Sequence, residues 1–206
     1  MPILIGKEAE NFLGNLPVAK SYLVKSKEKI ASISKILGYP LVLKIISKDA
    51  IHKTDINGVR IARNEEEANR FFEELIEISR KKGIKLDGIL LQEYVKGIET
   101  IIGIKKDPTF GHVIMFGIGG TLVEVLKKVS FRVCPINERD AEEMIKELED
   151  ILLGIRGFNV DLSFLKNVLV EVSKLCERKN IEELDINPFV INGSEGKIVD
   201  ARIVIK

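Results

Sequence analysis

Apolar positions along the 206-residue chain alternate between a helical and a strand-like spacing. Helices are predicted where apolar residues recur on one face, at residues 26–37, 64–78, 141–152 and 165–176. Gly38 is suited to end the first helix, because glycine adopts the left-handed conformation of a C-cap without strain. Asn64 and Glu67 resemble the capping box that opens a helix. Each helix has one apolar face that must pack against another element.

Short apolar runs bounded by turn residues predict strands between and after these helices. The expected strands are 41–46, 59–62, 88–94, 99–105, 112–116, 181–191 (interrupted at Pro188) and 197–205. Tight turns join neighbouring strands, so we expect antiparallel pairing and an α+β fold rather than a doubly wound parallel sheet. The expected domains are an N-terminal extension over 1–19, a small lobe over 20–87 and a large lobe over 88–206.

Composition and charge narrow the class of protein. Hydrophobic residues make up 45% of the chain and charged residues 31%, which is typical of a globular protein. The 32 basic residues nearly balance the 31 acidic residues, so nothing favours nucleic-acid binding. No apolar run is long enough to span a bilayer, and the N-terminus does not resemble a signal peptide. We therefore expect a cytoplasmic protein that binds neither nucleic acid nor a membrane.

The two cysteines, Cys134 and Cys176, lack metal-type spacing and are interpreted as small buried hydrophobic residues. Lys44 stands out because it is the one charge in an otherwise apolar strand. It could lie on an edge strand with its ammonium group reaching solvent. It could instead contact a phosphate group as a compact positive charge.

A polar loop at residues 52–58 contains His52, one of only two histidines in the chain. A loop histidine is often a solvated surface group. It can also act as a nucleophile, because neutral imidazole is abundant near pH 7 and can form a covalent phosphoramidate. The other histidine, His112, has no polar group beside it in sequence and is interpreted as structural.

Two acidic residues, Glu93 and Glu99, flank the joint between two predicted strands. They could be solvated edge charges. The joint could also be a hinge where a flat ring lies against backbone groups. The glycines at 117–120 permit either a simple turn or a close approach of backbone to a ligand. Neither the Walker nor the dinucleotide glycine motif is present.

Asn187 ends one C-terminal strand, and Asp200 lies in the next. Antiparallel pairing of these strands would bring the two side chains together. Two oxygen ligands, completed by nucleotide phosphates and water, would suit Mg²⁺. Asn-Pro by itself indicates only a turn, so the pairing with Asp200 carries this interpretation.

Taken in order, these motifs resemble the β subunit of ADP-forming acetyl-CoA synthetases, a family related to the succinyl-CoA synthetase β chain. The segments that carry the resemblance are 38–44, 52–55, 58–59, 92–97 with Glu99, 116–120, 130–133 and 185–188. The resemblance covers residues 20–206 and implies an ATP-grasp fold, in which two α+β lobes hold ATP between them.

The resemblance also implies roles for individual residues. Those implied to bind the nucleotide, ATP or ADP, are Lys44, Lys53, Gly58, Glu93, Val95, Glu99 and Arg132. Lys44 would contact the phosphates, Glu93 and Val95 the adenine, and Glu99 the ribose. Asn187 and Asp200 would bind Mg²⁺. His52 would receive a phosphoryl group in a relay.

In this family the partner is an α subunit that binds CoA and carries the first phosphohistidine. This chain contains no CoA-binding Rossmann unit, so the resemblance implies such a partner. The expected reaction converts acyl-CoA, ADP and phosphate to acid, ATP and CoA. Two alternatives stay open: an ATP-grasp carboxylate–amine ligase, and a nucleotide-binding regulatory subunit without catalysis.

Overall fold

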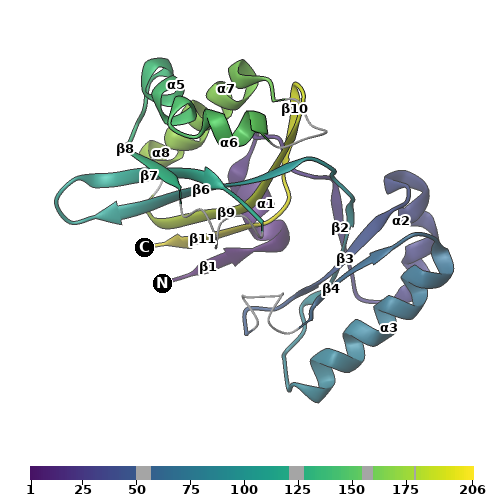
Figure 1. The fold of residues 1–206 in the computed structure, drawn as a ribbon. Helices are drawn as coiled ribbons and strands as arrows, with labels where there is room; N and C mark the ends of the chain where they lie inside the picture. Colours follow the sequence, from purple (N-terminus) through teal and green to yellow (C-terminus); the bar gives the residue numbers. More distant parts are fainter. Residues whose placement is uncertain (50–56, 121–127, 155–159, 179) are drawn as a thin grey trace. The chain divides into compact units, whose positions relative to one another are not determined.

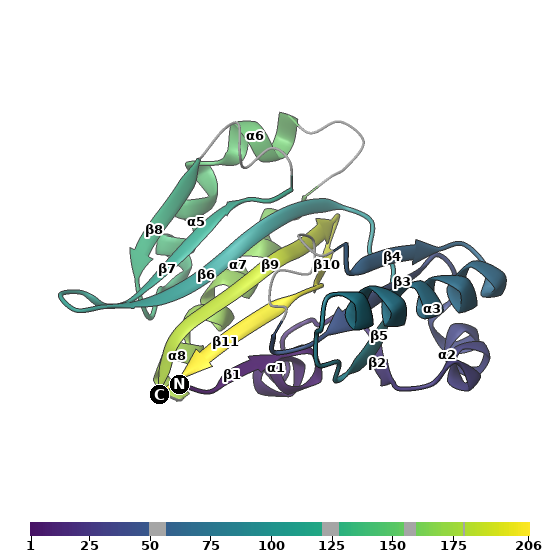
Figure 2. The same cartoon turned by 90° about the horizontal axis from the view of Figure 1, so that it is seen from below.

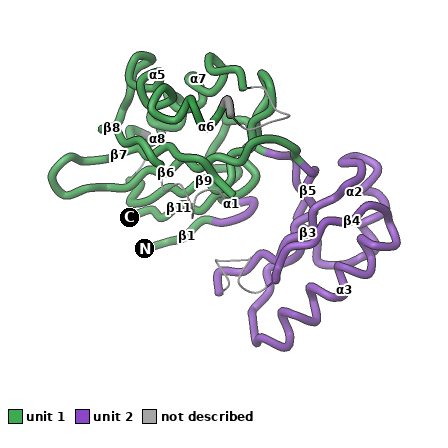
Figure 3. Tube along the Cα trace, viewed as in Figure 1, with its two compact units in different colours: residues 1–4, 8–18, 95–206 green, residues 5–7, 19–94 purple. Residues whose placement is uncertain are grey.

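The structure is a computed structural model that describes residues 1–49, 57–120, 128–154, 160–178 and 180–206. The chain forms two compact units (Figure 3). Unit 1 comprises residues 1–4, 8–18 and 95–206, and unit 2 comprises residues 5–7 and 19–94. Two of the predicted site residues, His52 and Lys53, lie outside the described residues.

Unit 2 is a four-stranded antiparallel sheet with helices on one face (Figure 1). Its strands, in the spatial order β2-β5-β3-β4, are β2 (Ser21–Val24), β5 (Gly88–Glu93), β3 (Leu41–Ile46) and β4 (Val59–Ala62). Its helices are the 3-10 turn η1 (Lys27–Lys29), α2 (Ile30–Leu37) and α3 (Glu65–Lys81).

The sequence explains how these elements pack. Alternate residues of β3, such as Leu43 and Ile45, join the apolar faces of α2 and α3 in one core. Asn64 caps α3 by accepting a hydrogen bond from Glu67 N at 2.8 Å. The Glu67 carboxylate accepts from Arg63 N instead of from the cap residue, so the expected capping box is only half formed.

Unit 1 is a seven-stranded antiparallel sheet in the order β1-β11-β9-β6-β7-β8, with β10 also pairing with β9 (Figures 1 and 2). Its strands are β1 (Ile3–Ile5), β6 (Ile98–Asp107), β7 (Gly111–Ile118), β8 (Val129–Val133), β9 (Ile181–Asn192), β10 (Glu195–Ile198) and β11 (Ala201–Ile205). Its helices are α1 (Gly6–Leu13, which belongs to unit 1 from Glu8 on), α5 (Glu138–Lys146), α6 (Glu149–Gly154), α7 (Leu162–Ser173) and α8 (Leu175–Arg178).

The core of unit 1 lies between the sheet and helices α5 and α7 (Figure 1). Residues of β6 and β7 alternate between this core and the opposite sheet face: Ile104 and Ile114 are buried, whereas their neighbours are more exposed. The opposite face, which we call the helix-free face, carries exposed apolar side chains such as Phe131 on β8.

The predicted α+β class with antiparallel sheets is confirmed. The boundaries of the two units differ from the expected domain boundaries in two places. Strand β5 pairs with β2 and β3, so residues 88–94 belong to unit 2 and not to the large lobe expected over 88–206. Residues 1–19 do not form a separate extension, because β1 joins the sheet of unit 1 and Leu13 of α1 joins its core.

Among the described residues, no helix has both the length and the apolar character needed to cross a membrane.

Candidate functional site

Lys44 lies at the centre of the unit 2 sheet. Its strand, β3, is paired on both sides, with Lys44 opposite Val59 of β4 and Leu90 of β5. Only 5% of the residue is exposed. The edge-strand interpretation is therefore wrong. Because Leu43 and Ile45 face the helices, Lys44 lies on the face of the sheet without helices.

Glu93, at the end of β5, makes two hydrogen bonds with the backbone of Lys20 within unit 2. Its carboxylate accepts a hydrogen bond from Lys20 N at 2.7 Å, and Glu93 N donates to Lys20 O at 3.0 Å. These bonds fix the end of β5 directly before Val95, the half-buried first residue of the long unit 1 segment. Gly58 is buried at the start of β4, where its carbonyl accepts from Ile45 N at 2.9 Å.

Glu99 is exposed on β6 and lies beside the glycines that follow β7. Gly119 N donates to Glu99 O at 2.7 Å. A Cβ atom on Gly119 would lie 2.9 Å from the Glu99 carbonyl carbon, which is too close for any side chain. Glycine at 119 is thus required by contact with the neighbouring strand, whatever else this segment meets.

Asn187 and Asp200 are brought together by an irregularity in the sheet. Thr100 pairs with Phe189 and Ile102 with Ile186, so two residues of β9, Asn187 and Pro188, oppose a single residue of β6. Asn187 is exposed at this bulge. Opposite it, β10 and β11 are interrupted at residues 199–200.

Backbone hydrogen bonds hold this interruption in place. Asn187 N donates to Asp200 O at 3.1 Å, and Val199 N donates to Pro188 O at 3.0 Å. One Asp200 carboxylate oxygen accepts from Ala201 N at 3.0 Å. Antiparallel pairing thus brings the backbones of Asn187 and Asp200 together, as predicted.

These two residues offer an amide and a carboxylate, which are hard oxygen donors of the kind Mg²⁺ prefers. Within the described ranges, no three His, Cys, Asp or Glu side chains converge in a way that could hold a metal ion. An amide and a carboxylate alone fit an ion that takes the rest of its coordination from a ligand and water, as Mg²⁺ commonly does.

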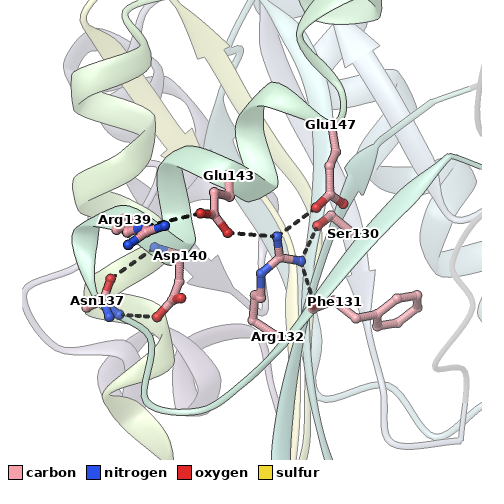
Figure 4. A network of polar contacts seen from close by, with 8 residues as sticks. All are labelled: Ser130, Phe131, Arg132, Asn137, Arg139, Asp140, Glu143 and Glu147. Carbon is pink, nitrogen blue, oxygen red and sulfur yellow. Dashed lines mark hydrogen bonds and ion pairs between the residues drawn. The ribbon is translucent and has the colours of Figure 1, made fainter.

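Arg132, on β8, is bound to carboxylates at and beyond the end of α5 (Figure 4). Its Nη2 donates to Glu147 at 2.7 Å and lies 3.6 Å from Glu143. Its Nη1 donates to Phe131 O at 2.8 Å and to Ser130 Oγ at 3.3 Å. The hydrogen bond with Glu147 is the main cause that raises the pKa of Arg132, and hydrogen bonds from Ser130 and then Arg132 lower the pKa of Glu147. Sequence reasoning missed these partners, although carboxylates spaced four residues apart after β8 were a signal.

The predicted site residues fall in both units. Lys44, Gly58 and Glu93 belong to unit 2, whereas the remaining described ones belong to unit 1. The latter are Val95, Glu99, Arg132, Asn187 and Asp200. Within unit 1, Asn187 and Asp200 are in backbone contact, while Arg132 is engaged with carboxylates of α5 and of the residue that follows it.

Comparison with known proteins assigns the family. Residues 3–205 match the ATP-grasp domain family. The chain is 39% identical over 212 residues to the β subunit of acetate–CoA ligase (ADP-forming) I of Pyrococcus furiosus, covering 98% of this chain and 91% of that subunit. It is 40% identical over 202 residues to the β subunit of the second such ligase of that organism, covering 93% and 86%. It spans only 30% of the length of the acetate–CoA ligase (ADP-forming) I of Archaeoglobus fulgidus, to which it is 38% identical over 92% of its own length.

Solved structures agree. An acetyl-coenzyme A synthetase 1 of Ca. Korarchaeum cryptofilum, solved with coenzyme A, Ca-AMPCP and HgCl⁺, superposes with a TM-score of 0.92 at 39% identity, covering 99% of this chain and 93% of that chain. A second structure of that enzyme, with coenzyme A and Mg-AMPPCP, has a TM-score of 0.83 at 38% identity and covers 99% and 93%. The chain therefore belongs to the ATP-grasp family, and within it to the group formed by the ADP-forming acetate–CoA ligases and their β subunits.

Proposed function

We propose that this chain is the nucleotide-binding β subunit of an ADP-forming acyl-CoA synthetase. The enzyme would convert acyl-CoA, ADP and phosphate to acid, ATP and CoA, and this chain would move the phosphoryl group between a histidine and the nucleotide. The observation that carries the proposal is the match to separate β subunits over 91% and 86% of their length.

In this proposal, each implied residue contacts a different part of the nucleotide. The buried Lys44 contacts phosphate oxygens as a point charge, and Lys53 and Gly58 also contribute to nucleotide binding. Glu93 and Val95 bind the adenine, and Glu99 binds the ribose hydroxyls. Arg132 contributes to phosphate binding only by exchanging its carboxylate partners for phosphate, so its role needs a separate test.

Asn187 and Asp200 hold Mg²⁺ in this proposal. Their adjacency across the β9 bulge supports it, because a backbone hydrogen bond from Asn187 N to Asp200 O holds an amide and a carboxylate at one interruption of the sheet. When bound, Mg²⁺ would offset part of the negative charge of the phosphate groups. The protein residues keep the phosphates positioned and leave the transfer itself to an imidazole.

His52 performs that transfer. In the direction of ATP consumption, an imidazole nitrogen forms a bond to the γ-phosphorus while the bond from that phosphorus to the ADP oxygen breaks. ADP then leaves with the electron pair. In the direction of ATP synthesis, ADP attacks the phosphoramidate and frees the imidazole. The partner in the overall reaction is an α subunit that binds CoA and carries the first phosphohistidine.

The test uses the two histidines as a matched pair. The full chain is incubated with γ-labelled Mg-ATP, with and without the co-purified α subunit, and acid-labile, base-stable phosphate on this chain is measured. We expect label on the wild type and on His112→Gln, and none on His52→Ala, which should still bind ADP in calorimetry. His112 suits the control because its ring Nε2 lies 2.6 Å from Ile181 O, a structural contact.

Two outcomes would contradict the proposal. Label retained in His52→Ala would remove this imidazole from the mechanism. A wild type that binds nucleotide but takes up no label, with or without the α subunit, would also contradict it. Formation of an acyl phosphate would then point to a carboxylate–amine ligase. Absence of an acyl phosphate would point to a regulatory subunit.

A further inference from the structure

The exposed apolar side chains of unit 1 gather on one side of its sheet. Apart from Met1, the large hydrophobic residues that are exposed in the described part of unit 1 are Phe110, Val129, Phe131 and Val133. The three on β8 alternate with Arg132, whose guanidinium reaches the carboxylates at the end of α5, so they lie on the helix-free face. Apolar side chains that gather on one face, instead of lying scattered, mark a surface that another molecule covers.

A groove of about 850 Å³ lies on this face. Two cross-strand pairs form its apolar wall: Met115 of β7 lies opposite Phe131, and Val113 lies opposite Val133. The next position across the sheet is Gly103 of β6, which pairs with Met115 and has no side chain to fill the space. The sheet is therefore hollowed beside a row of apolar side chains, a shape that receives a protruding side chain of a partner.

The hairpin of β6 and β7 extends the groove beyond the neighbouring strands (Figures 1 and 2). The pairing of β6 with β9 ends at Lys105 and that of β7 with β8 ends at Val113, so the turn of the hairpin projects from the sheet. One Asp107 carboxylate oxygen accepts from Thr109 N at 2.8 Å and from Phe110 N at 3.0 Å, which fixes this turn. Phe110, which is 65% exposed, is thereby held at the end of the groove as a preorganised aromatic anchor.

The charges around the groove cancel. Three basic and three acidic residues line it: Lys105, Lys106, Arg132, Asp107, Glu183 and Asp185. Ion pairs within unit 1 already engage Lys106, Arg132 and Glu183. An anionic ligand or lipid surface therefore meets no net opposite charge here, whereas an apolar protein surface fits.

We propose that this groove docks the α subunit of the proposed enzyme, through an apolar surface with one side chain that enters the hollow at Gly103. The proposal rests on the proposed function, which requires such a partner. Because the chain matches separate β subunits, surface contacts must hold that partner.

The position of the groove favours the α subunit over other occupants. Asp185, in the wall of the groove, lies two residues before Asn187 on β9. The groove therefore adjoins the place where the proposed function puts the nucleotide phosphates. An α subunit docked there is held beside the phosphoryl group that passes between the subunits, a transfer in which a second copy of this chain or a lipid surface has no part.

The experiment measures, by calorimetry, the affinity of the full chain for the co-purifying subunit that binds CoA. We expect Phe110→Ser and Phe131→Ser each to bind this subunit about 10- to 100-fold more weakly than the wild type. The matched control is Ile36→Ser, because Ile36 is 62% exposed but lies on α2 of unit 2; it should bind as tightly as the wild type. All three variants should bind Mg-ADP with wild-type affinity, and circular dichroism checks that each is folded.

Several results would overturn the proposal. One is wild-type affinity for the α subunit in both phenylalanine variants, and another is an equal loss in Ile36→Ser. Loss of Mg-ADP binding in the phenylalanine variants would assign the groove to the nucleotide site instead. A dimer of this chain that these variants abolish while α binding persists would assign it to a second copy.

Failure of this proposal and failure of the proposed function are distinguishable. A wild type that is labelled by Mg-ATP, but whose α subunit binds independently of Phe110 and Phe131, overturns the docking alone. A wild type that binds the α subunit through both phenylalanines but takes up no label supports the docking and overturns the phosphoryl transfer.

Discussion

Gly97 lies directly before β6, between Val95 and Glu99, in unit 1. A Cβ atom at this position would lie 2.4 Å from Ile191 O, 2.8 Å from Ile191 C and 2.9 Å from Val190 Cγ1. Ordinary contact begins near 3.4 Å, so Gly97→Ala must move one strand by roughly 1 Å. Two of these atoms are backbone, which cannot yield by a side-chain rotation.

The shift falls on the β6–β9 ladder, where Ile98 pairs with Ile191. Overpacking strain of about 1–3 kcal/mol, together with a weakened ladder hydrogen bond of about 1 kcal/mol, predicts a loss of about 2–4 kcal/mol in the free energy of unfolding. Urea denaturation followed by circular dichroism measures this loss. In a chain of this size it corresponds to a fall of roughly 5–15 °C in unfolding temperature.

Gly103→Ala is the matched control on the same strand. Its Cβ would meet the flexible Met115 Cε at 3.4 Å, an ordinary contact. Restriction of the unfolded chain should make this variant neutral or more stable by about 0.4–1 kcal/mol. The reasoning is refuted if Gly97→Ala unfolds within about 0.5 kcal/mol of the wild type, or if both variants lose the same stability.

Two further predictions concern local interactions. Asn64→Ala removes the side-chain cap of α3 and should lower the free energy of unfolding by about 1 kcal/mol in urea denaturation. Asn64→Asp should retain most of the wild-type stability, because aspartate also caps helices. Equal stability of all three proteins would contradict the role of Asn64 as a cap. Glu147→Gln removes the charge that Arg132 binds and should lower stability by only about 0.5 kcal/mol near pH 7, because the Glu147 side chain is 47% exposed. Since folding lowers the pKa of Glu147 below its usual value near 4.5, the wild-type advantage should be full above that value and disappear as the pH falls through the lowered pKa. An advantage that persists at about pH 2 would show that the charge is not its source.

The fold class could be predicted because turns and periodicity are local. Short apolar runs bounded by turn residues identified β3 and β6, and Asn64 marked the start of α3. The domain boundary could not be predicted in the same way, because β5 is assigned to unit 2 only through its pairing with β2 and β3. The strand pairing of β1 and β8 is also non-local: both strands are short, and nothing in their own sequence selects a partner.

The site was predictable where strand pairing follows from adjacency in sequence. The turn between β9 and the last strands made the approach of Asn187 and Asp200 predictable. Pro188 was expected to interrupt its strand, but β9 continues through it, because the bulge opposite Ile101 accommodates a residue that has no N–H to donate.

Contacts that depend on packing were not predictable. The central position of Lys44 follows from the order of strands in space, and the ion pairs of Arg132 depend on how α5 lies beside β8.

The central claim is that Asn187 and Asp200 bind the magnesium of a nucleotide. The most direct measurement is calorimetric titration of ADP into wild type, Asp200→Asn and Asp185→Asn, each with Mg²⁺ and with a chelator. Asparagine at 200 keeps an oxygen acceptor for Ala201 N, and Asp185 is a carboxylate of β9 to which no metal role is assigned.

With Mg²⁺, Asp200→Asn should bind ADP about 10- to 100-fold more weakly than the wild type, and Asp185→Asn should bind nearly as well as the wild type. In chelator, all three proteins should bind with similar, weaker affinity. An equal loss for Asp200→Asn with and without Mg²⁺, or no loss in either condition, would contradict the account.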